Sequence, residues 1–151
     1  MTIVANGLDE VTALAGTDLG ATEWMEVAQE RVNTFADATD DHQWIHLDAE
    51  RAAAGPFKGT IAHGFLTLSL VIPLFTQLLQ VKGIAMGINY GLNRVRFPAP
   101  VRVGARIRML GTVVSVEPVD GGVQAVFDFT VEAEGSPKPV CVAQSIQRFY
   151  A

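Results

Sequence analysis

The chain has 151 residues, of which 49% are hydrophobic and 18% are charged, and its net charge is −5 at pH 7. A chain of this length can bury one core without disulfides, and its composition excludes a disordered protein and indicates a surface partly covered by another subunit. The acidic balance argues against nucleic acid as a partner, because phosphate contacts need a concentrated positive surface.

The first part of the chain predicts a strand followed by a helix. Residues 1–20 carry scattered glycine and threonine, so we expect a loosely packed lead-in with one helical turn. Residues 22–27 alternate polar and apolar side chains, as strands do, and residues 29–39 place apolar side chains at helical spacing. The strand therefore leads directly into the helix.

A turn-rich segment, residues 39–43, follows this helix. Asp48 is a suitable N-cap for a second short helix, which Gly55 and the proline after it should end. The sequence therefore predicts that Asp41 and His46 lie on a loop between two short helices. A tight turn there can aim a carboxylate and an imidazole at one water, as acid–base chemistry requires.

Residues 64–81 form an apolar run that predicts a helix buried on every side, because its leucines are not confined to one face. Pro73 should kink this helix, and polar residues within the run argue against a membrane span. His63 and Gly64 stand where the helix would begin. Unpaired backbone N–H groups and the positive end of the helix dipole can hold an oxyanion there.

After Gly83 the sequence changes to β-structure. Turn-forming residues separate four stretches rich in β-branched and aromatic side chains: 85–97, 106–116, 123–131 and 140–149. This order predicts an α+β fold, in which a curved antiparallel sheet wraps around the long apolar helix. We expect a single domain over residues 1–151 and, without a basic apolar leader, a cytoplasmic protein.

The residues also permit other kinds of site. His42 and His46 are four positions apart, and His63 is available as a further ligand. A zinc site of this type needs a helix through residues 43–45, where turn-forming and bulky residues disfavour one. We therefore expect no metal and no cofactor. Neither the lone Cys141 nor Ser69 has the local partners of a catalytic nucleophile, and both fit buried positions.

Five of the eleven cationic residues lie close together in the chain: Arg94, Arg96, Arg102, Arg106 and Arg108. They are either outward side chains on neighbouring strands or a patch for a phosphorylated small molecule, and the sequence leaves both readings open.

Two motifs carry a family resemblance. One is Asp-His-Gln-Trp-Ile-His at residues 41–46, and the other is Gly-Thr-Ile-Ala-His-Gly at residues 59–64, directly before the apolar helix. Together they resemble the MaoC-like dehydratases, also called (R)-specific enoyl-CoA hydratases. The usual run in that family is Gly-Asp-x-Asn-Pro-x-His, and here Asp40, Gln43 and Trp44 replace its glycine, asparagine and proline. The version in this chain resembles the branch named after nodulation protein N.

The resemblance implies a hot dog fold and reversible hydration of trans-2-enoyl thioesters to (R)-3-hydroxyacyl thioesters in fatty acid metabolism. Asp41 and His46 would activate water, and the backbone N–H of Gly64 would stabilise the enolate oxygen, although packing alone can also require this glycine. Gln43, Trp44 and His63 would support these groups or line the pocket. The resemblance further implies an acyl-CoA or acyl carrier protein thioester as substrate, a homodimer and no membrane association.

Two rival functions stay open. Thioester hydrolysis on the same fold would direct a carboxylate-activated water at the carbonyl carbon. A non-catalytic subunit would bind acyl thioesters without turnover, but such a subunit has no evident use for both Asp41 and His46. The sequence does not say which of these two residues is the base and which is the acid.

Overall fold

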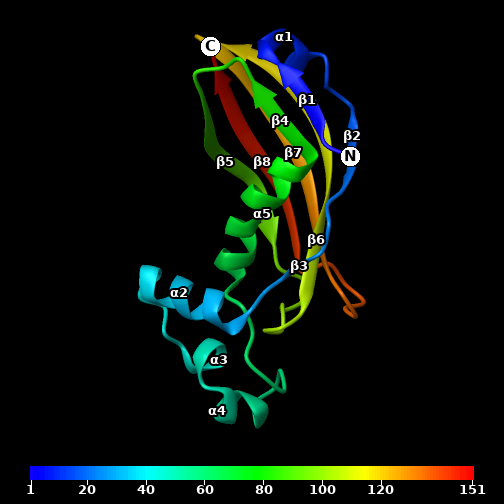
Figure 1. Ribbon diagram of the computed structural model, residues 1–151. Coiled ribbons are helices and arrows are strands. Elements are labelled where there is room, and N and C mark those ends of the chain that lie inside the picture. Colours follow the sequence, from blue (N-terminus) through cyan, green and yellow to red (C-terminus); the bar gives the residue numbers. More distant parts are fainter.

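The computed structural model describes residues 1–151, and it shows a curved antiparallel sheet wrapped around one long helix, α5 (Gly64–Leu78) (Figure 1). The strands lie in the order β2 (Asp18–Ala21), β6 (Arg106–Val119), β7 (Gly122–Ala133), β8 (Cys141–Tyr150) and β5 (Met86–Arg96). The short strand β3 (Met25–Glu26) also pairs with β6. These observations confirm the predicted α+β class and the sheet around a central helix.

The core lies between the concave face of the sheet and α5. β7 and β8 alternate buried and less buried residues, as expected for strands with one face on a core. Phe75 of α5 packs edge-on against Phe127 and Phe129 of β7, with ring centroids 5.0 and 5.6 Å apart. Edge-to-face pairs each contribute about 1 kcal/mol beyond area burial, so this cluster fixes the helix against the sheet.

The N-terminal segment is not the loose lead-in that the sequence predicts. β1 (Ile3–Asn6) pairs in parallel with β4 (Leu79–Lys82), and α1 (Gly7–Thr12) buries Val11. β2 (Asp18–Ala21) pairs with β6, whereas the strand predicted at 22–27 is reduced to β3 (Met25–Glu26). The pairing partners lie far along the chain, so local patterns could not reveal them.

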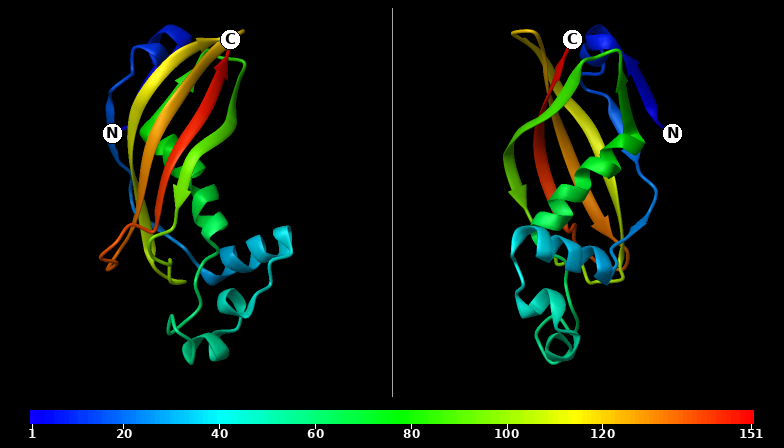
Figure 2. Two further views of the ribbon diagram at one scale, coloured as in Figure 1. Left: turned by 180° about the vertical axis from the view of Figure 1, so that it is seen from behind. Right: turned by 60° about the vertical axis from the view of Figure 1, so that its left-hand side comes forward.

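Three helices gather at the end of the molecule where α5 begins (Figure 2): α2 (Gln29–Thr39), α3 (Trp44–Leu47) and α4 (Ala49–Ala53). The carboxylate of Asp48 accepts a hydrogen bond from the backbone N–H of Arg51 at 3.0 Å, as its predicted capping role requires. The single turn α3 replaces part of the predicted loop. The side-chain amide of Gln29 donates to the carbonyl of His46 at 2.8 Å, a tertiary contact that holds this turn in place.

The prediction that the central helix is buried on every side is wrong. Its leucines at 66, 70, 74 and 78 are buried, but Phe65 is 70% exposed and Ile72 is 37% exposed. The helix also ends at Leu78, because the chain then extends into β4. No helix is both long enough and apolar enough to cross a membrane.

The exposed face of α5 continues onto β5, which is an edge strand with β8 as its only neighbour. Almost every residue of β5 is exposed, and four of these are large and apolar: Met86, Ile88, Tyr90 and Leu92. An uncovered apolar edge of this length is unusual for a monomer. We call it the β5 face.

Candidate active site

A cavity of about 440 Å³ lies where α2, α3 and the start of α5 meet. Its lining brings together Asp41, His46, His63 and Gly64, which the sequence analysis singled out. The other lining residues are Phe35, Thr39, Phe65 and Phe97. The sequence places Asp41 and His46 near each other, the family resemblance adds His63 and Gly64, and the fold brings all four to one cavity.

The polar side chains of this cavity are close enough to act on one water. A carboxylate oxygen of Asp41 and one ring nitrogen each of His46 and His63 all lie within 4.8 Å of one another. Asp41 is exposed, whereas His46 and His63 are only 6% and 2% exposed. A water at ordinary hydrogen-bond distance, about 2.8 Å, from two such groups fits this separation.

The proton on His46 can be located from its hydrogen bond. Its Nδ1 lies 2.7 Å from the backbone carbonyl of Ile61, and a carbonyl only accepts. Nδ1 therefore carries the proton, and the lone pair of Nε2 is free to accept one. Burial lowers the pKa of His46, and the nearby His63 lowers it further, while the Ile61 bond and Asp41 act in the opposite direction. The net effect is a lowered pKa, which favours the neutral imidazole at pH 7.

This lowered pKa predicts the pH dependence of any reaction that uses His46 as a base. The neutral imidazole persists below its ordinary pKa of 6.5, so kcat/KM should fall only at more acidic pH. The measurement is kcat/KM of crotonyl-CoA hydration from about pH 5 to 8, the range in which histidines titrate. An acid limb with its midpoint above 6.5 would contradict a neutral, buried His46 as the base.

His63 connects three parts of the site. It is the N-cap residue of α5, its ring stacks on His46 with centroids 3.8 Å apart, and its Nε2 donates to the backbone carbonyl of Asp41 at 3.0 Å. Its Nδ1 is buried without a hydrogen-bond partner. His63 thereby holds the backbone of the carboxylate and the face of the imidazole in a fixed relation to the helix start.

The three side chains also meet the distance requirement for a metal site. The sequence analysis disfavoured a zinc site because it expected no helix through residues 43–45, but α3 forms a helical turn over part of that segment. His46 and His63 lie together, whereas His42 pairs with Asp37 at 3.0 Å. Metal coordination requires the lone pairs of both rings to point at one ion, and each lone pair lies in its ring plane. The two rings stack with an angle of only 23° between their planes, which directs the lone pairs along nearly parallel planes.

The start of α5 offers backbone donors to this cavity. No side chain caps the helix, so the first N–H groups, including that of Gly64, have no partner within it. A Cβ at Gly64 would lie 3.0 Å from Cδ2 of Phe97, which is tighter than most real contacts, so the ring or the backbone would have to shift slightly. The ring of Phe97 therefore supplies a packing reason for glycine here. Sequence reasoning missed Phe97, because it follows β5 and carries no local signal of nearness to Gly64.

Two other candidates from the motif lie outside the cavity. Gln43 is exposed at the start of α3, and only its backbone carbonyl has a defined role, accepting from the N–H of His46 at 3.1 Å. Trp44 stacks under the guanidinium of Arg51 at 4.3 Å and lies against Gly55. Neither side chain is therefore placed to touch a ligand in the cavity.

The alternative nucleophiles are not activated. Burial raises the pKa of the Cys141 thiol to about 11, so almost no thiolate exists at neutral pH. The hydroxyl of Ser69 donates to the carbonyl of Phe65 at 2.8 Å. Of the clustered arginines, Arg106 and Arg108 pair with glutamates on β7 and beyond it, which weakens the case for a phosphate patch.

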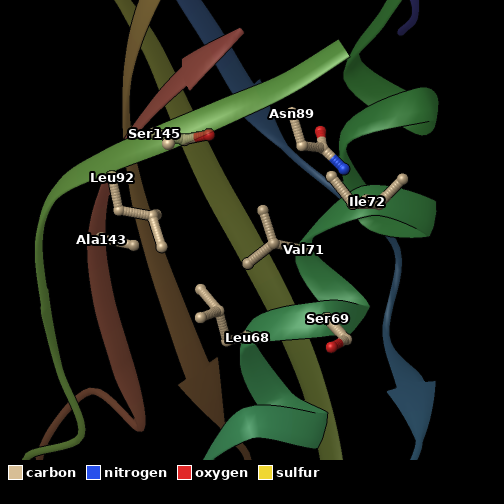
Figure 3. Close-up of a pocket in the computed structure, with 9 residues that line it drawn as sticks. Leu68, Ser69, Val71, Ile72, Asn89, Leu92, Ala143 and Ser145 are labelled. Atoms are coloured by element: carbon tan, nitrogen blue, oxygen red, sulfur yellow. The ribbon is translucent and has the colours of Figure 1, made fainter.

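A second cavity, of about 250 Å³, lies between α5 and the strands β5 and β8 (Figure 3). Its apolar lining includes Leu68 and Ile72 of α5 and Leu92 of β5, and its polar lining includes Asn89 and Ser145. Leu68 is one helical turn beyond Gly64, so this cavity lies farther along α5 than the first one. We call it the helix-side cavity.

Known proteins resemble this chain over most of its length. Residues 10–134 match the family model described as MaoC like domain. A protein named 3-hydroxyacyl-thioester dehydratase Z, from Mycobacterium tuberculosis, is 57% identical over 143 residues, which cover 94% of this chain and 95% of that protein. Nodulation protein N from Rhizobium leguminosarum bv. viciae is 44% identical over 144 residues, which cover 92% of this chain and 88% of that protein.

A solved structure agrees with the architecture. An R-hydratase from Pseudomonas aeruginosa superposes with a TM-score of 0.72 at 24% identity, over 90% of this chain and 81% of that one. This likeness shows that the two chains share a fold.

Proposed function

Because this chain belongs to the MaoC-like dehydratase family, we propose that it is an enzyme that reversibly adds water to trans-2-enoyl thioesters and forms (R)-3-hydroxyacyl thioesters. The observation that carries this function is the placement of Asp41 and a neutral His46 beside the uncapped start of α5. The name of the Mycobacterium tuberculosis relative supports the same class of substrate.

The geometry supports a division of roles. The thioester carbonyl accepts a hydrogen bond from the N–H of Gly64, where the positive end of α5 stabilises the charge that develops on oxygen. One water donates hydrogen bonds to Nε2 of His46 and to the carboxylate of Asp41. These two bonds aim the oxygen of the water at Cβ of the substrate. His46 takes a proton as the C–O bond forms, and the Asp41–His46 pair returns a proton to Cα. The net change is the addition of H and OH across the double bond.

We assign His63 a positioning role in this reaction. Its hydrogen bond to the Asp41 carbonyl and its stack on His46 set the distance between the two acid–base groups. Small displacements of reacting groups are costly, since about 1 Å of misplacement can lower a rate about a hundredfold.

The direct test is the loss of enoyl absorbance when purified protein is added to crotonyl-CoA, with chiral analysis of the product. A parallel assay for free thiol separates hydration from thioester hydrolysis, because hydration leaves the thioester bond intact. An (R)-3-hydroxy product without thiol release supports the proposal. Thiol release, or no turnover of either kind, would favour the hydrolase or the non-catalytic subunit.

We further propose a cytoplasmic enzyme of fatty acid metabolism that acts as a homodimer through the β5 face. The edge of β5 and its exposed apolar side chains would be paired and covered in such a dimer. In such a dimer, the partner copy would also cover the open side of the helix-side cavity, because this cavity and the β5 face both lie on the exposed side of α5. Comparing the rates of hydration of the coenzyme A thioester and the acyl carrier protein thioester would show which carrier the enzyme uses.

Light scattering should give twice the chain mass of 16.2 kDa at micromolar concentration. Ile88→Lys, which places a charge on the β5 face, should convert the protein to a monomer, because burying an unpaired charge is unfavourable. Val114→Lys is a matched control, since Val114 is 43% exposed, like Ile88 at 41%, but lies on the interior strand β6. A monomeric parent protein would contradict the proposal.

Hydration should not depend on a metal ion. If Asp41 and His46 alone activate water, dialysis against a strong chelator should leave the rate on crotonyl-CoA unchanged. The measurement pairs this assay with elemental analysis of untreated protein. Stoichiometric zinc, together with activity that is lost on chelation and restored by zinc, would instead make Asp41, His46 and His63 metal ligands.

A further inference from the structure

The side of β8 that faces α5 changes from apolar to polar along the strand. Ala143 is followed at the next two inward positions by Ser145 and Gln147, which are buried at 7% and 5% exposure. Nε2 of Gln147 is buried and has no hydrogen-bond partner. An unpaired buried amide lowers stability, so its presence in a core requires an explanation.

A third polar residue adjoins these two. Asn89 of β5 is the direct cross-strand partner of Gln147, so their side chains share one face of the sheet. Asn89 and Ser145 both line the helix-side cavity. Figure 3 shows them at one end of this cavity, with Leu68 at the other. Ser69 also lies at the Leu68 end, but its hydroxyl already donates to the carbonyl of Phe65, so the polar groups without such a partner gather at the other end, the polar end.

The polar end is the one farther from Asp41 and His46. Phe65, Leu68 and Ile72 follow one another along the outward face of α5, and Phe65 also lines the catalytic cavity. At 1.5 Å per residue, Leu68 lies about 6 Å and Ile72 about 12 Å along the helix from Gly64. An acyl chain whose carbonyl is held at Gly64 would pass Leu68 first and then reach the polar end.

We propose that the preferred substrate is an enoyl thioester whose acyl chain carries an oxygen function, a hydroxyl or a keto group, on its distal part. This inference rests on the proposed hydratase function and adds the substrate class. Asn89 and Ser145 contact the oxygen from the wall of the cavity. Gln147, which lies beside them, supplies an N–H donor. Rotation of its side-chain amide by a half-turn exchanges nitrogen and oxygen, so either atom can face the ligand. A plain alkyl chain would leave these groups unpaired.

The experiment compares two trans-2-enoyl-CoA substrates of equal length, one with an unsubstituted chain and one with a hydroxyl near its distal end. The parent enzyme should favour the hydroxylated chain in kcat/KM by about tenfold or more, because a site that binds a hydroxyl discriminates against the analogue without it. Gln147→Leu should abolish or reverse this preference. Crotonyl-CoA, which is too short to pass Leu68, should react equally well with both proteins.

Gln144→Leu is the control, because it removes an amide from the outward face of the same strand, where Gln144 donates to Asp128 at 2.9 Å. The preference for the hydroxylated chain should survive this change. Ser145→Ala is a smaller change and should weaken the preference. It replaces Gln147→Leu in the test if that variant does not fold. Preference of the parent enzyme for the plain chain, or equal effects of Gln147→Leu on both chains, would overturn the inference. Failure of the parent enzyme to hydrate any of the three enoyl-CoA substrates would instead refute the hydratase function.

Discussion

Asp41→Asn and His46→Ala should each lower the hydration of crotonyl-CoA by about a hundredfold or more, the usual contribution of a positioned acid–base group. Asn keeps the shape of the carboxylate but cannot take a proton, and alanine removes the free Nε2 that accepts one. The effect should appear in kcat, since both groups act on the reacting water. The measurement is steady-state kinetics on variants whose circular dichroism and melting temperature show that they are folded.

His42→Ala is the matched control for this pair. His42 lies between the two residues in the chain, but its ring is half exposed and pairs with Asp37 outside the cavity. Its replacement should leave kcat unchanged. A folded Asp41→Asn or His46→Ala variant with near-normal kcat would show that these residues are not the acid–base pair.

Gly64→Ala should also lower kcat/KM by about a hundredfold, because the new methyl group must displace either the ring of Phe97 or the start of α5. Displacement of α5 would move the N–H that binds the thioester oxygen. The assay is again crotonyl-CoA hydration. Gly91→Ala is the control, because a Cβ at that glycine meets nothing within 4 Å and crotonyl-CoA is too short to reach the helix-side cavity that Gly91 lines.

A second variant separates the two reasons for glycine at this position. If packing against Phe97 is the reason, Phe97→Leu in the Gly64→Ala background should restore a large part of the activity, because leucine lacks the ring that the methyl group meets. If the thioester itself needs the space, the double variant should stay as slow as Gly64→Ala. The latter result would contradict the packing explanation.

Local chemistry in the sequence determined the long regular elements and half of the site. The four long strands and the helix at 29–39 were predictable because side-chain alternation and helical spacing act within a few residues. The nearness of Asp41 and His46 was predictable for the same reason, since a short turn limits their separation. The motif at residues 59–64 added the start of α5 through family resemblance.

Tertiary structure decided the rest, because each remaining contact joins residues far apart in the chain. The stack of His63 on His46, the ring of Phe97 over Gly64 and the pairing of β1 with β4 leave no periodic signal in either partner. The same holds for the face of α5 that stays open. The sequence of an apolar helix does not indicate which of its sides the sheet will cover, because that depends on where the sheet ends at β5.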